Sequence, residues 1–556
     1  MAKESSPARH TTPRPALDRR AFLKTLGTGA AATVALTSLG QTGLDAKVEA
    51  CELGPQTAQQ RQVMAWDIRR EAAQLAFERP YPDHACNGEE DDYNRTRIAN
   101  FSKGLPHNAL GEVDPAAYNA LLAALASGDP AAFEAIPLGG VRPLRNPQAG
   151  LAFDLEGPDS HHLAIRPAPR IDSPENSAEA AELYWMALAR DVPFADYAGS
   201  PLIAQAADDL SAFSDFRGPQ QAGQVTPATL FRGHTPGDLA GPYLSQFLLK
   251  ECPFGSLTIS QRQQTVVAGL DYLTAFEAWR AIQDGTAAGQ DRFDPQRCYI
   301  RNGRDLGQYV HVDALYQAYL TACLILLGWG APVDPGNPYA TTTTQDAFGT
   351  WGGPHILSLV TEVATRALKA VWYQKWFVHR RLRPEAFGGL VHNVLTRTAH
   401  YPINAESLDS PVLDIVFRKH GSYLLPQAYP EGSPLHPAYG AGHATVAGAC
   451  VTILKAWFDE SFVLPDPVVP DSQGTRLVAY TEADAGALTV GGELNKVATN
   501  IAMGRNFAGI HWRTDYSESL RLGEEVAIGV LEEQQATYNE GGSFTLTKFD
   551  GTTITI

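Results

Sequence analysis

Three separated segments of the chain place basic or imidazole side chains next to an expected helix end. The first is Lys375-Trp-Phe-Val-His-Arg-Arg-Leu-Arg-Pro384. Pro384 disfavours helical geometry at the preceding Arg383, so the helix that carries Lys375 is expected to end near that residue. The spacing between Lys375 and Arg383 is about two helical turns, which predicts that both point to one side. Two cations there suit the binding of an anion, although a solvated basic helix end has the same pattern.

The second segment is a loop of small residues that runs directly into an apolar helix. It reads Ser433-Pro-Leu-His-Pro-Ala-Tyr-Gly-Ala-Gly-His-Ala-Thr445. Free backbone N–H groups at a helix N-terminus bind oxyanions, and Gly442 would leave them accessible. His443 follows at once, where an imidazole can donate or accept a proton. An ordinary glycine-rich turn before a helix is the alternative interpretation.

The third segment is Arg505-Asn-Phe-Ala-Gly-Ile-His-Trp-Arg-Thr-Asp515. If His511 opens a helix, Asp515 lies one turn further on the same face and can orient the imidazole by a hydrogen bond to its second nitrogen. Arg505 carries a permanently charged, forked group that suits a tetrahedral oxyanion. A surface loop with a His–Asp pair is the alternative.

Taken together, the three segments resemble the signature shared by vanadium-dependent haloperoxidases and the related acid phosphatases: Lys, then Arg-Pro; Gly-His opening a helix; then Arg-x5-His-x3-Asp. The gap between Lys375 and Arg383, and the stretch from His436 to His443, are most similar to the algal and cyanobacterial bromoperoxidase branch. The likeness extends to three further stretches, Ile98–His107, Phe231–His234 and Gly241–Gln246. It implies the mainly α, helical-bundle fold of that superfamily.

The resemblance implies a vanadate cofactor with His511 as the axial ligand of vanadium. It also implies which groups neutralise or hydrogen-bond the vanadate oxygens: Lys375, Arg383, Arg505 and the backbone amide of Gly442. Hydrogen peroxide, a halide (bromide first) and a small organic acceptor would be the substrates. The product would be an equivalent of hypohalous acid that halogenates the acceptor.

The same resemblance assigns the remaining candidate site residues. His443 would be the acid–base group for peroxide, and Lys375 would polarise the O–O bond. His436 and Trp372 would line the halide pocket, and Asp515 would orient His511 through a hydrogen bond to its second ring nitrogen.

One position departs from the family pattern, because Ala441 stands where Ser-Gly-His is usual. A hydroxyl donor is therefore missing, at a cost of about 1–3 kcal/mol in binding or turnover. Two alternatives remain open on sequence grounds. One is a phosphatase, with His511 as nucleophile and His443 protonating the leaving group. The other is an oxyanion-binding protein with a degraded site.

Apolar residues at three- and four-residue intervals predict the helices that must position these groups. We expect helices over 54–78, 114–134, 177–190, 312–326, 354–380, 443–457, 485–503 and 513–537. In the last segment, Ser543 to Ile556, apolar and polar residues alternate, which predicts a short β-hairpin. Another short hairpin is expected around Leu151 to Leu163. The fold class is mainly α, with packed helices, long loops and minor β-hairpins.

Composition limits the classes of function. The 556 residues include 44% hydrophobic residues, which excludes a disordered or fibrous chain. Lys+Arg is 44 against Asp+Glu 61, a net charge of -17, so nucleic acid is not expected as a partner. Any bound anion must therefore be held by a local cluster of cations.

The N-terminal residues resemble a twin-arginine export signal. Arg19-Arg20-Ala-Phe-Leu-Lys24 precedes a weakly apolar, uncharged run to Gly40, although a basic tail with a chance arginine pair is the alternative. We therefore expect a signal and linker over 1–45, and one helical domain over 46–556 with its catalytic half at about 300–540. A periplasmic or secreted bacterial enzyme without a membrane span in the mature chain follows from this reading. A homo-oligomer is also expected, with helices near 54–134 as candidate interface elements.

Six cysteines are sparse and form no CxxC pair, which disfavours a structural zinc site. Cys323 and Cys450 lie in apolar helical sequence and are expected in the core. The other four lie in loop-like sequence and could form disulfides in an oxidising compartment, with the pairing left open: Cys51, Cys86, Cys252 and Cys298.

Overall fold

The computed structural model describes residues 54–556, so the predicted export signal lies outside the described residues. Packing divides the chain into two units, Met1–Val63 and Met64–Ile556. Of the first unit the structure describes residues 54–63, which include the start of a helix. The fold that follows is that of the second unit.

Most of the regular structure is helical, as predicted. The helices are α2 (Ala58–Glu78), α3 (Glu89–Asp92), α4 (Pro115–Ser127), α5 (Pro130–Glu134), α6 (Pro174–Ala189), α7 (Pro201–Ala212), α8 (Phe276–Gln283), α9 (Gly303–Tyr309), α10 (Gln317–Trp329), α11 (Gly353–Tyr373), α12 (Pro384–Leu395), α13 (Ala405–Asp409), α14 (Pro411–His420), α15 (Gly442–Trp457), α16 (Val490–Phe507) and α17 (Arg513–Gln535). Five short 3₁₀ turns, η1 (Pro147–Leu151), η2 (Ser160–His162), η3 (Phe194–Gly199), η4 (Gln246–Leu248) and η6 (Ala485–Ala487), and a π-helical turn, η5 (Gln374–His379), complete the helical elements of the described residues.

Three antiparallel hairpins are the strand structure of residues 54–556. They pair β1 (Cys252–Phe254) with β2 (Leu257–Ile259), β3 (Val468–Pro470) with β4 (Leu477–Ala479), and β5 (Thr545–Thr547) with β6 (Thr553–Thr555). In the last of these, Leu546 lies opposite Ile554.

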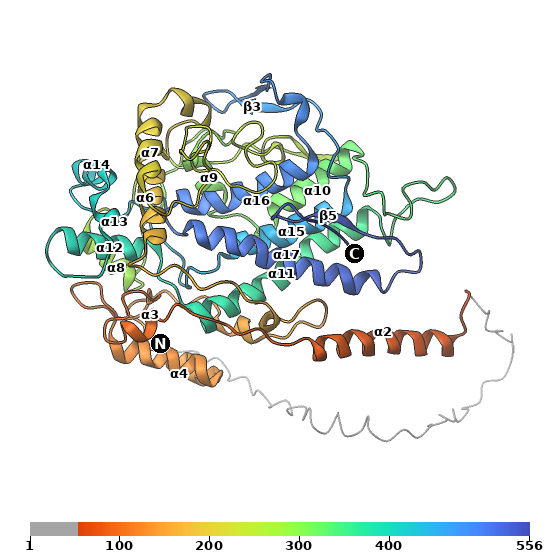
Figure 1. Ribbon diagram of the computed structural model, residues 1–556, viewed down its shortest axis with the longest axis horizontal. Helices are drawn as coiled ribbons and strands as arrows, with labels where there is room; N and C mark the ends of the chain where they lie inside the picture. Colours follow the sequence, from red (N-terminus) through yellow and green to blue (C-terminus); the bar gives the residue numbers. More distant parts are fainter. Residues whose placement is uncertain (1–53) are drawn as a thin grey trace, which may run out of the picture. The chain divides into compact units, whose positions relative to one another are not determined.

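Helix α15 forms the centre of the core, and α11, α16 and α17 pack around it (Figure 1). Every residue of α15 except His443 is buried. The helix approaches α17 closely because Gly448 and Gly523 stand at the crossing, where a Cβ atom would collide with the backbone oxygens of Leu520 and Thr445 respectively. The core therefore fixes the two helix starts that carry the second and third predicted segments.

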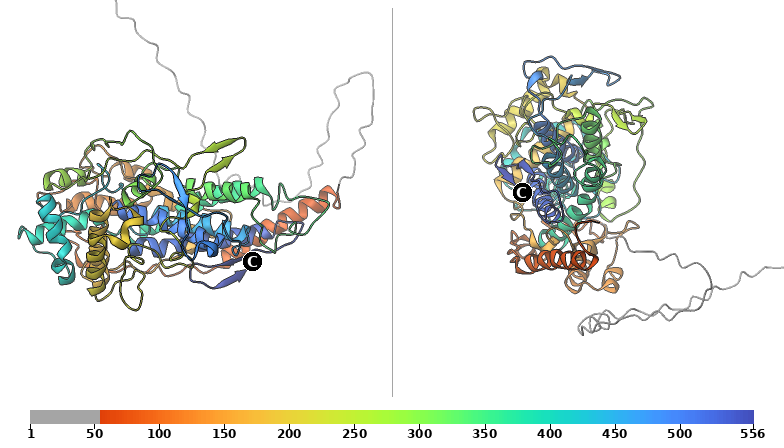
Figure 2. Two further views of the ribbon diagram at one scale, coloured as in Figure 1. Left: turned by 90° about the horizontal axis from the view of Figure 1, so that it is seen from above. Right: turned by 90° about the vertical axis from the view of Figure 1, so that its right-hand side faces the viewer.

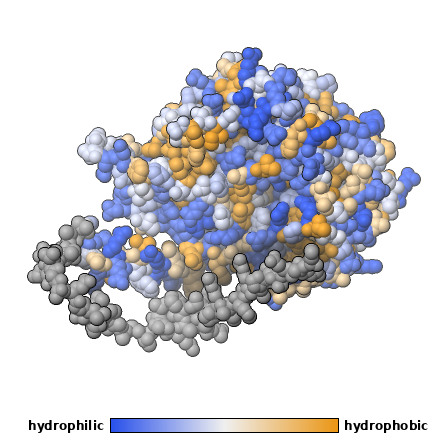
Figure 3. Space-filling model, turned by 180° about the vertical axis from the view of Figure 1, so that it is seen from behind, coloured by the Kyte–Doolittle hydropathy of each residue, from blue (hydrophilic) through white to orange (hydrophobic). Residues whose placement is uncertain are grey.

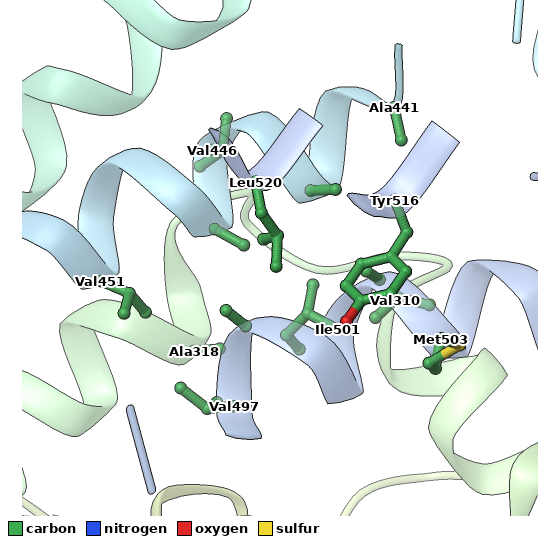
Figure 4. Packing of buried hydrophobic residues seen from close by; sticks show 14 of the residues in the cluster. Val310, Ala318, Ala441, Val446, Val451, Val497, Ile501, Met503, Tyr516 and Leu520 are labelled. Atoms are coloured by element: carbon green, nitrogen blue, oxygen red, sulfur yellow. The ribbon is translucent and has the colours of Figure 1, made fainter. Parts of the chain in front are cut away.

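The apolar packing between these helices reaches the start of α15. Figure 4 shows side chains from α10, α15, α16 and α17 meeting in one cluster, with Ala441 at the beginning of the α15 ribbon. Helix α6 stands across the long helices and contacts α16, and α7, α13 and α14 pack against α6 (Figures 1 and 2). Although α6 is largely buried, it includes three acidic residues, Glu175, Glu179 and Glu182.

The periodic helices were predicted to within a few residues, and the C-terminal hairpin was predicted correctly. The range 114–134 is instead two helices, because Gly128 ends α4 in the left-handed region (φ 63°). The range 485–503 is a 3₁₀ turn followed by α16, and α6 starts after the N-cap Ser173 rather than at Ser177.

Three predictions about secondary structure were wrong. Residues 151–163 form turns, including η1 and η2, and no hairpin. Two hairpins, β1–β2 and β3–β4, lie in sequence without clear alternation. Helix α10 begins at Gln317, and Val312 and Tyr316, expected on its buried face, are 75% and 38% exposed.

The expectation of disulfides is also wrong within the described residues. Cys86, Cys252, Cys298, Cys323 and Cys450 are free thiols, and Cys51 lies outside the described residues. Cys323 and Cys450 are buried, as predicted. None of the helices within residues 54–556 is both long enough and apolar enough to cross a membrane.

Candidate functional site

Lys375 lies in the π-helical turn that continues α11, and its side chain is fully buried. The ammonium group donates hydrogen bonds to the carbonyl oxygens of Pro437 (2.8 Å) and Ala438 (3.0 Å). Burial, reinforced by the nearby Arg383, holds the pKa of Lys375 well below its ordinary value. The first predicted segment is thereby joined to the second.

Arg383 connects all three segments. Its Nε donates to the carbonyl oxygen of His436 and its Nη2 to Nδ1 of the same residue, both at 2.9 Å. Its Nη1 donates to the carbonyl oxygen of Ile510 (2.8 Å) and to Nε2 of His511 (2.9 Å). Burial lowers the pKa of this guanidinium to about 9.

Lys375 and Arg383 meet in a different way from the one predicted. The helical path ends at His379, and Arg380 takes left-handed backbone geometry (φ 41°). Pro384 is then the first residue of α12, with Arg383 as its N-cap. The two cations are brought together by a turn between two helices, not by the repeat of one helix.

Arg505 approaches the same place from the last turn of α16. Its Nη1 donates to the carbonyl oxygen of Val310. Its Nε is buried and has no hydrogen-bond partner within residues 54–556. A buried donor without a partner costs free energy, so this nitrogen favours a ligand that accepts a hydrogen bond.

His511 stands just before α17, and Nδ1 of its imidazole lies 2.7 Å from Oδ2 of Asp515, as the spacing predicted. Because Arg383 can only donate, Nε2 of His511 is the acceptor in their hydrogen bond, and the proton is on Nδ1. Burial and the surrounding cations hold the pKa of His511 well below its ordinary value. The imidazole is therefore neutral, and the lone pair on its Nε2 accepts the hydrogen bond from Arg383.

Asp515 is held by an arginine that the sequence analysis did not single out. Arg381 donates to Oδ1 of Asp515 (2.9 Å), to Glu179 (2.9 Å) and to Asn176 (3.1 Å). Its only sequence signal is its place in the Arg-Arg-Leu-Arg stretch, since its partners on α6 lie about two hundred residues away.

His443 occupies the first turn of α15, and its side chain is 17% exposed. Its Nε2 lies 3.0 Å from Oδ1 of Asp313, a residue the sequence analysis missed. Burial lowers the pKa of His443, and Asp313 opposes this effect. An acidic side chain at the start of an otherwise apolar run was the available signal for Asp313.

Gly442 and Ala441 form the start of α15, where the first-turn N–H groups have no partner inside the helix. The Ala441 amide donates to the hydroxyl of Ser519 (2.7 Å), and the methyl group supplies no N-cap hydrogen bond. A Cβ atom at Gly442 would lie 3.2 Å from the Trp372 ring, so glycine permits close packing of this ring against the helix start.

His436 and Trp372 lie side by side, with ring centres 4.8 Å apart. Nδ1 of His436 accepts from Arg383, which places the proton of the neutral ring on Nε2. Burial, with Lys375 and Arg383 adding to it, holds the pKa of His436 well below its ordinary value. The Trp372 ring also stacks over the ammonium group of Lys375, at 5.8 Å. The structure thus brings all ten predicted site residues together.

The cations of this cluster differ from the other buried cations of residues 54–556. Ten lysines and arginines are buried there, and seven of them have a carboxylate oxygen within 4.0 Å: Lys103, Arg190, Arg304, Arg381, Lys455, Lys496 and Arg513. The three without such a partner among the described residues are Lys375, Arg383 and Arg505. Three buried, unneutralised cations around one neutral imidazole require an anion.

The donor set fits a tetrahedral oxyanion whose central atom accepts a nitrogen ligand. It comprises an ammonium, two guanidinium groups, a helix N-terminus and the Nε2 lone pair of His511. Within residues 54–556, no group of three or more His, Cys, Asp or Glu side chains could hold a bare metal ion. The chemistry of the cluster therefore matches an oxometallate or phosphate better than a metal cation.

Comparisons with known proteins agree on one group of relatives. A family model described as the VCPO second helical-bundle domain matches residues 355–540. The chain is 41% identical to a vanadium-dependent bromoperoxidase of Corallina pilulifera, over 90% of this chain and 99% of that protein. It is 36% identical to a vanadium-dependent bromoperoxidase of Ascophyllum nodosum, over 84% and 87%. The structure of the homohexameric second vanadate-dependent bromoperoxidase of Ascophyllum nodosum superposes with a TM-score of 0.88 at 30% identity, covering 93% of this chain and 94% of that one.

Proposed function

This chain belongs to the vanadium-dependent bromoperoxidase family, and we propose that its buried cationic cluster is the site at which it uses vanadate and hydrogen peroxide to oxidise bromide. The product is an equivalent of hypobromous acid that halogenates a small organic acceptor. The observation that carries this proposal is the set of three buried cations without carboxylate partners around Nε2 of His511.

The residues that would hold vanadate follow from the donor set. His511 would supply the nitrogen ligand, because Asp515 keeps the proton on Nδ1 and leaves the lone pair on Nε2. That lone pair accepts from Arg383 in the structure, and it would exchange this hydrogen bond for the bond to vanadate. Lys375, Arg383 and Arg505, with the Gly442 amide, neutralise the oxygens. Bound vanadate supplies a Lewis acid that activates peroxide without changing its own oxidation state.

The remaining residues handle the proton and the halide. His443, neutral because burial lowers its pKa, can accept a proton from peroxide, and Asp313 stabilises the resulting imidazolium. His436 and Trp372 present a ring N–H and an aromatic face on one side of Lys375, which suits a polarisable anion. Ala441 leaves this site with one hydroxyl fewer than the family pattern, which weakens binding or turnover but leaves the other donors in place.

One assay separates bromoperoxidase from phosphatase and from a degraded oxyanion site. Vanadate-free protein is given vanadate, peroxide and bromide and scored for bromination of a phenol, beside phosphate release from an aryl phosphate. We expect bromination that depends on vanadate and is lost in His511→Ala. Phosphate release alone would favour the phosphatase, and anion binding without either activity would favour a degraded site. Full bromination by His511→Ala would overturn the assigned ligand.

The protein is further proposed to form a homo-oligomer. The structural relative is described as homohexameric. Trp66 and Phe77 of α2 are eleven residues apart, which places them on one side of the helix, and they are 65% and 85% exposed. Light scattering on the wild type and on Trp66→Glu with Phe77→Glu tests this, because a loss of mass in the variant would place the interface on α2.

Export by the twin-arginine route is proposed from Arg19 and Arg20. Replacement of both by lysine should retain the precursor in the cytoplasm, which cell fractionation measures. We also propose that residues from about 300 to 540 form the catalytic half of the chain, since the residues of the proposed site, from Asp313 to Asp515, lie in this range.

A further inference from the structure

Asp313 also borders a cavity on the side of the protein formed by the first hairpin and α10. This cavity of about 640 Å³ is lined by residues from 252–264, from 293–297 and from the α9–α10 connection. The hairpin β1–β2 lies on the side turned away from the viewer in Figure 1, as the two views of Figure 2 show. Figure 3 presents that side, where apolar residues gather in patches between hydrophilic ones.

Part of the cavity wall is apolar and open to solvent. Phe254, Ile259 and Phe293 line it and are 50%, 48% and 43% exposed, and Val312 and Tyr316 from the α9–α10 connection are 75% and 38% exposed. Single exposed apolar residues need no explanation, but five around one cavity indicate a binding surface.

Ten of the twenty residues that line the cavity are polar or charged, and five of these are glutamines. Its charged lining residues are Arg262, Arg297 and Asp313. The two arginines are exposed and form no ion pair with any residue of 54–556, whereas Asp313 is bonded to His443. Tyr309 also lines the cavity, while its hydroxyl is buried and has no hydrogen-bond partner among the described residues. In a chain with a net charge of -17, this is a local site for an anion.

The α9–α10 connection joins this cavity to the proposed catalytic cluster. The carbonyl oxygen of Val310 accepts from Arg505, and Asp313 accepts from His443, while Val312, Ala314 and Tyr316 line the cavity. A molecule bound in the cavity therefore lies one hydrogen-bonded side chain away from the proposed acid–base histidine.

We propose that this cavity binds the organic acceptor, an electron-rich aromatic compound such as a phenol that carries an anionic group. The proposal rests on the bromoperoxidase function proposed above. The aromatic ring contacts the phenylalanine wall, and its anionic group pairs with Arg262 and Arg297, away from the repelling Asp313.

Bromination of such a ring balances with the oxidant that the enzyme supplies. A ring carbon uses a π-electron pair to form the C–Br bond, and the Br–O bond of hypobromous acid breaks with its electron pair on oxygen. The ring then loses the proton from that carbon, which joins the hydroxide to give water. Bromine is reduced and the ring is oxidised, with no further reactant.

The test compares two phenols of similar ring reactivity that differ in charge, 4-hydroxyphenylacetate and 4-methylphenol, competing in one mixture. The ratio of their brominated products from the vanadate-loaded enzyme is divided by the ratio that reagent hypobromous acid gives. We expect the enzyme to favour the anionic phenol by about fivefold, as two exposed ion pairs would.

Variants locate the preference. Arg262→Gln with Arg297→Gln should bring the ratio back to that of the reagent, while Arg262→Lys with Arg297→Lys should retain most of it. The control Arg95→Gln with Arg418→Gln removes the same charge from exposed arginines elsewhere and should keep the wild-type ratio. Bromide-dependent consumption of peroxide without any phenol should be equal in all of these proteins.

Several results would overturn the proposal. If the wild type gives the same product ratio as reagent hypobromous acid, the oxidant reacts only after it leaves the protein. An unchanged ratio in the glutamine variant would mean that the preference arises elsewhere. A change of oligomer mass in that variant would identify the cavity as a subunit interface. Absence of bromide-dependent peroxide consumption in the wild type would instead contradict the bromoperoxidase function itself, which keeps the two failures distinct.

Discussion

Two neighbouring groups of buried cations differ in whether carboxylates of the protein neutralise their charge. Arg381 and Arg513 are neutralised within the protein by carboxylates, chiefly Glu179 and Glu182 of α6. Lys375 and Arg383 are close by in sequence, yet donate only to carbonyl oxygens and imidazole nitrogens. The first group, which we call the scaffold group, is neutralised without a ligand. The second group is neutralised only when an anion is bound.

Asp515 shows how the two groups are kept separate. It lies between them, and its carboxylate accepts from Arg381 on one side and from Nδ1 of His511 on the other. Because its charge is already shared with Arg381, it orients the imidazole without neutralising the three open cations. Helix α6 contributes no group to the proposed site, yet it determines the electrostatics of that site. Its glutamates neutralise Arg381 and Arg513, so that Lys375, Arg383 and Arg505 are the buried cations left to bind an anion.

The largest expected effect comes from the scaffold group. Arg381→Met leaves Glu179 and Asp515 buried without their partner, which should lower the free energy of unfolding of the vanadate-free protein by about 3–5 kcal/mol. Urea denaturation measures this. The control Arg217→Met removes an exposed arginine paired with Asp215 and should cost less than about 1 kcal/mol. Equal losses in the two variants would remove the distinction between the scaffold and a surface pair.

Lys375→Met should behave in the opposite way. In the vanadate-free protein it removes an unneutralised buried charge at the cost of two hydrogen bonds to carbonyl oxygens, so stability should change by no more than about 1 kcal/mol. Vanadate at a hundred times its Kd should stabilise the wild type by about 2.7 kcal/mol. The variant should lose most of this gain at the same concentration, with sulfate at equal ionic strength as the control. A loss of stability as large as that of Arg381→Met would mean that Lys375 serves the fold.

Asp313 is the carboxylate that contacts the cluster through His443, and its removal tests the proton-handling role. Asp313 raises the pKa of His443 against the lowering caused by burial, so Asp313→Asn should lower that pKa further. If neutral His443 is the active base, the acid side of the pH–rate profile should move down by about 1 pH unit. Gln317→Leu, on the same cavity wall, is the control and should leave the profile in place. A profile that moves to higher pH would contradict the assignment of His443 as a base.

The residues of the two groups of buried cations also differ in how well they can be predicted from the sequence. The open cations, with His443 and His511, lie in three short motifs, each at a helix end. Each motif alone also fits an ordinary helix end or turn, and the resemblance of the three together to the haloperoxidase signature is what predicted Arg383, His443 and His511. The scaffold depends on α6, whose Glu179 and Glu182 look like ordinary first-turn acids until the fold brings them to Arg381 and Arg513. Such pairs over long sequence distances carry no local pattern.

Asp313 was missed for a different physical reason. Val312, Leu315, Tyr316 and Tyr319 have the spacing of a buried helix face, and that spacing predicts a helix from 312. In the structure Val312 and Tyr316 line an open cavity, and the helix begins at Gln317. The same apolar residue types at the same spacing can line a cavity or form the buried face of a helix. Sequence periodicity alone therefore cannot distinguish these two structures.

The smallest expected effect concerns the missing hydroxyl at Ala441, and it tests whether the open cations alone set the affinity for the anion. Ala441→Ser adds one donor at the start of α15, which should tighten vanadate binding by about 1 kcal/mol, or roughly fivefold in Kd. The new side chain can instead cap the helix, which would raise the stability of the vanadate-free protein by a similar amount without changing Kd. Equilibrium titration with vanadate, measured beside unfolding without vanadate, separates the two outcomes. Ala441→Gly controls for loss of the methyl packing in Figure 4 and should not tighten binding. An unchanged Kd in Ala441→Ser, with higher stability, would show that the serine faces the helix and that the three cations and His511 already set the affinity.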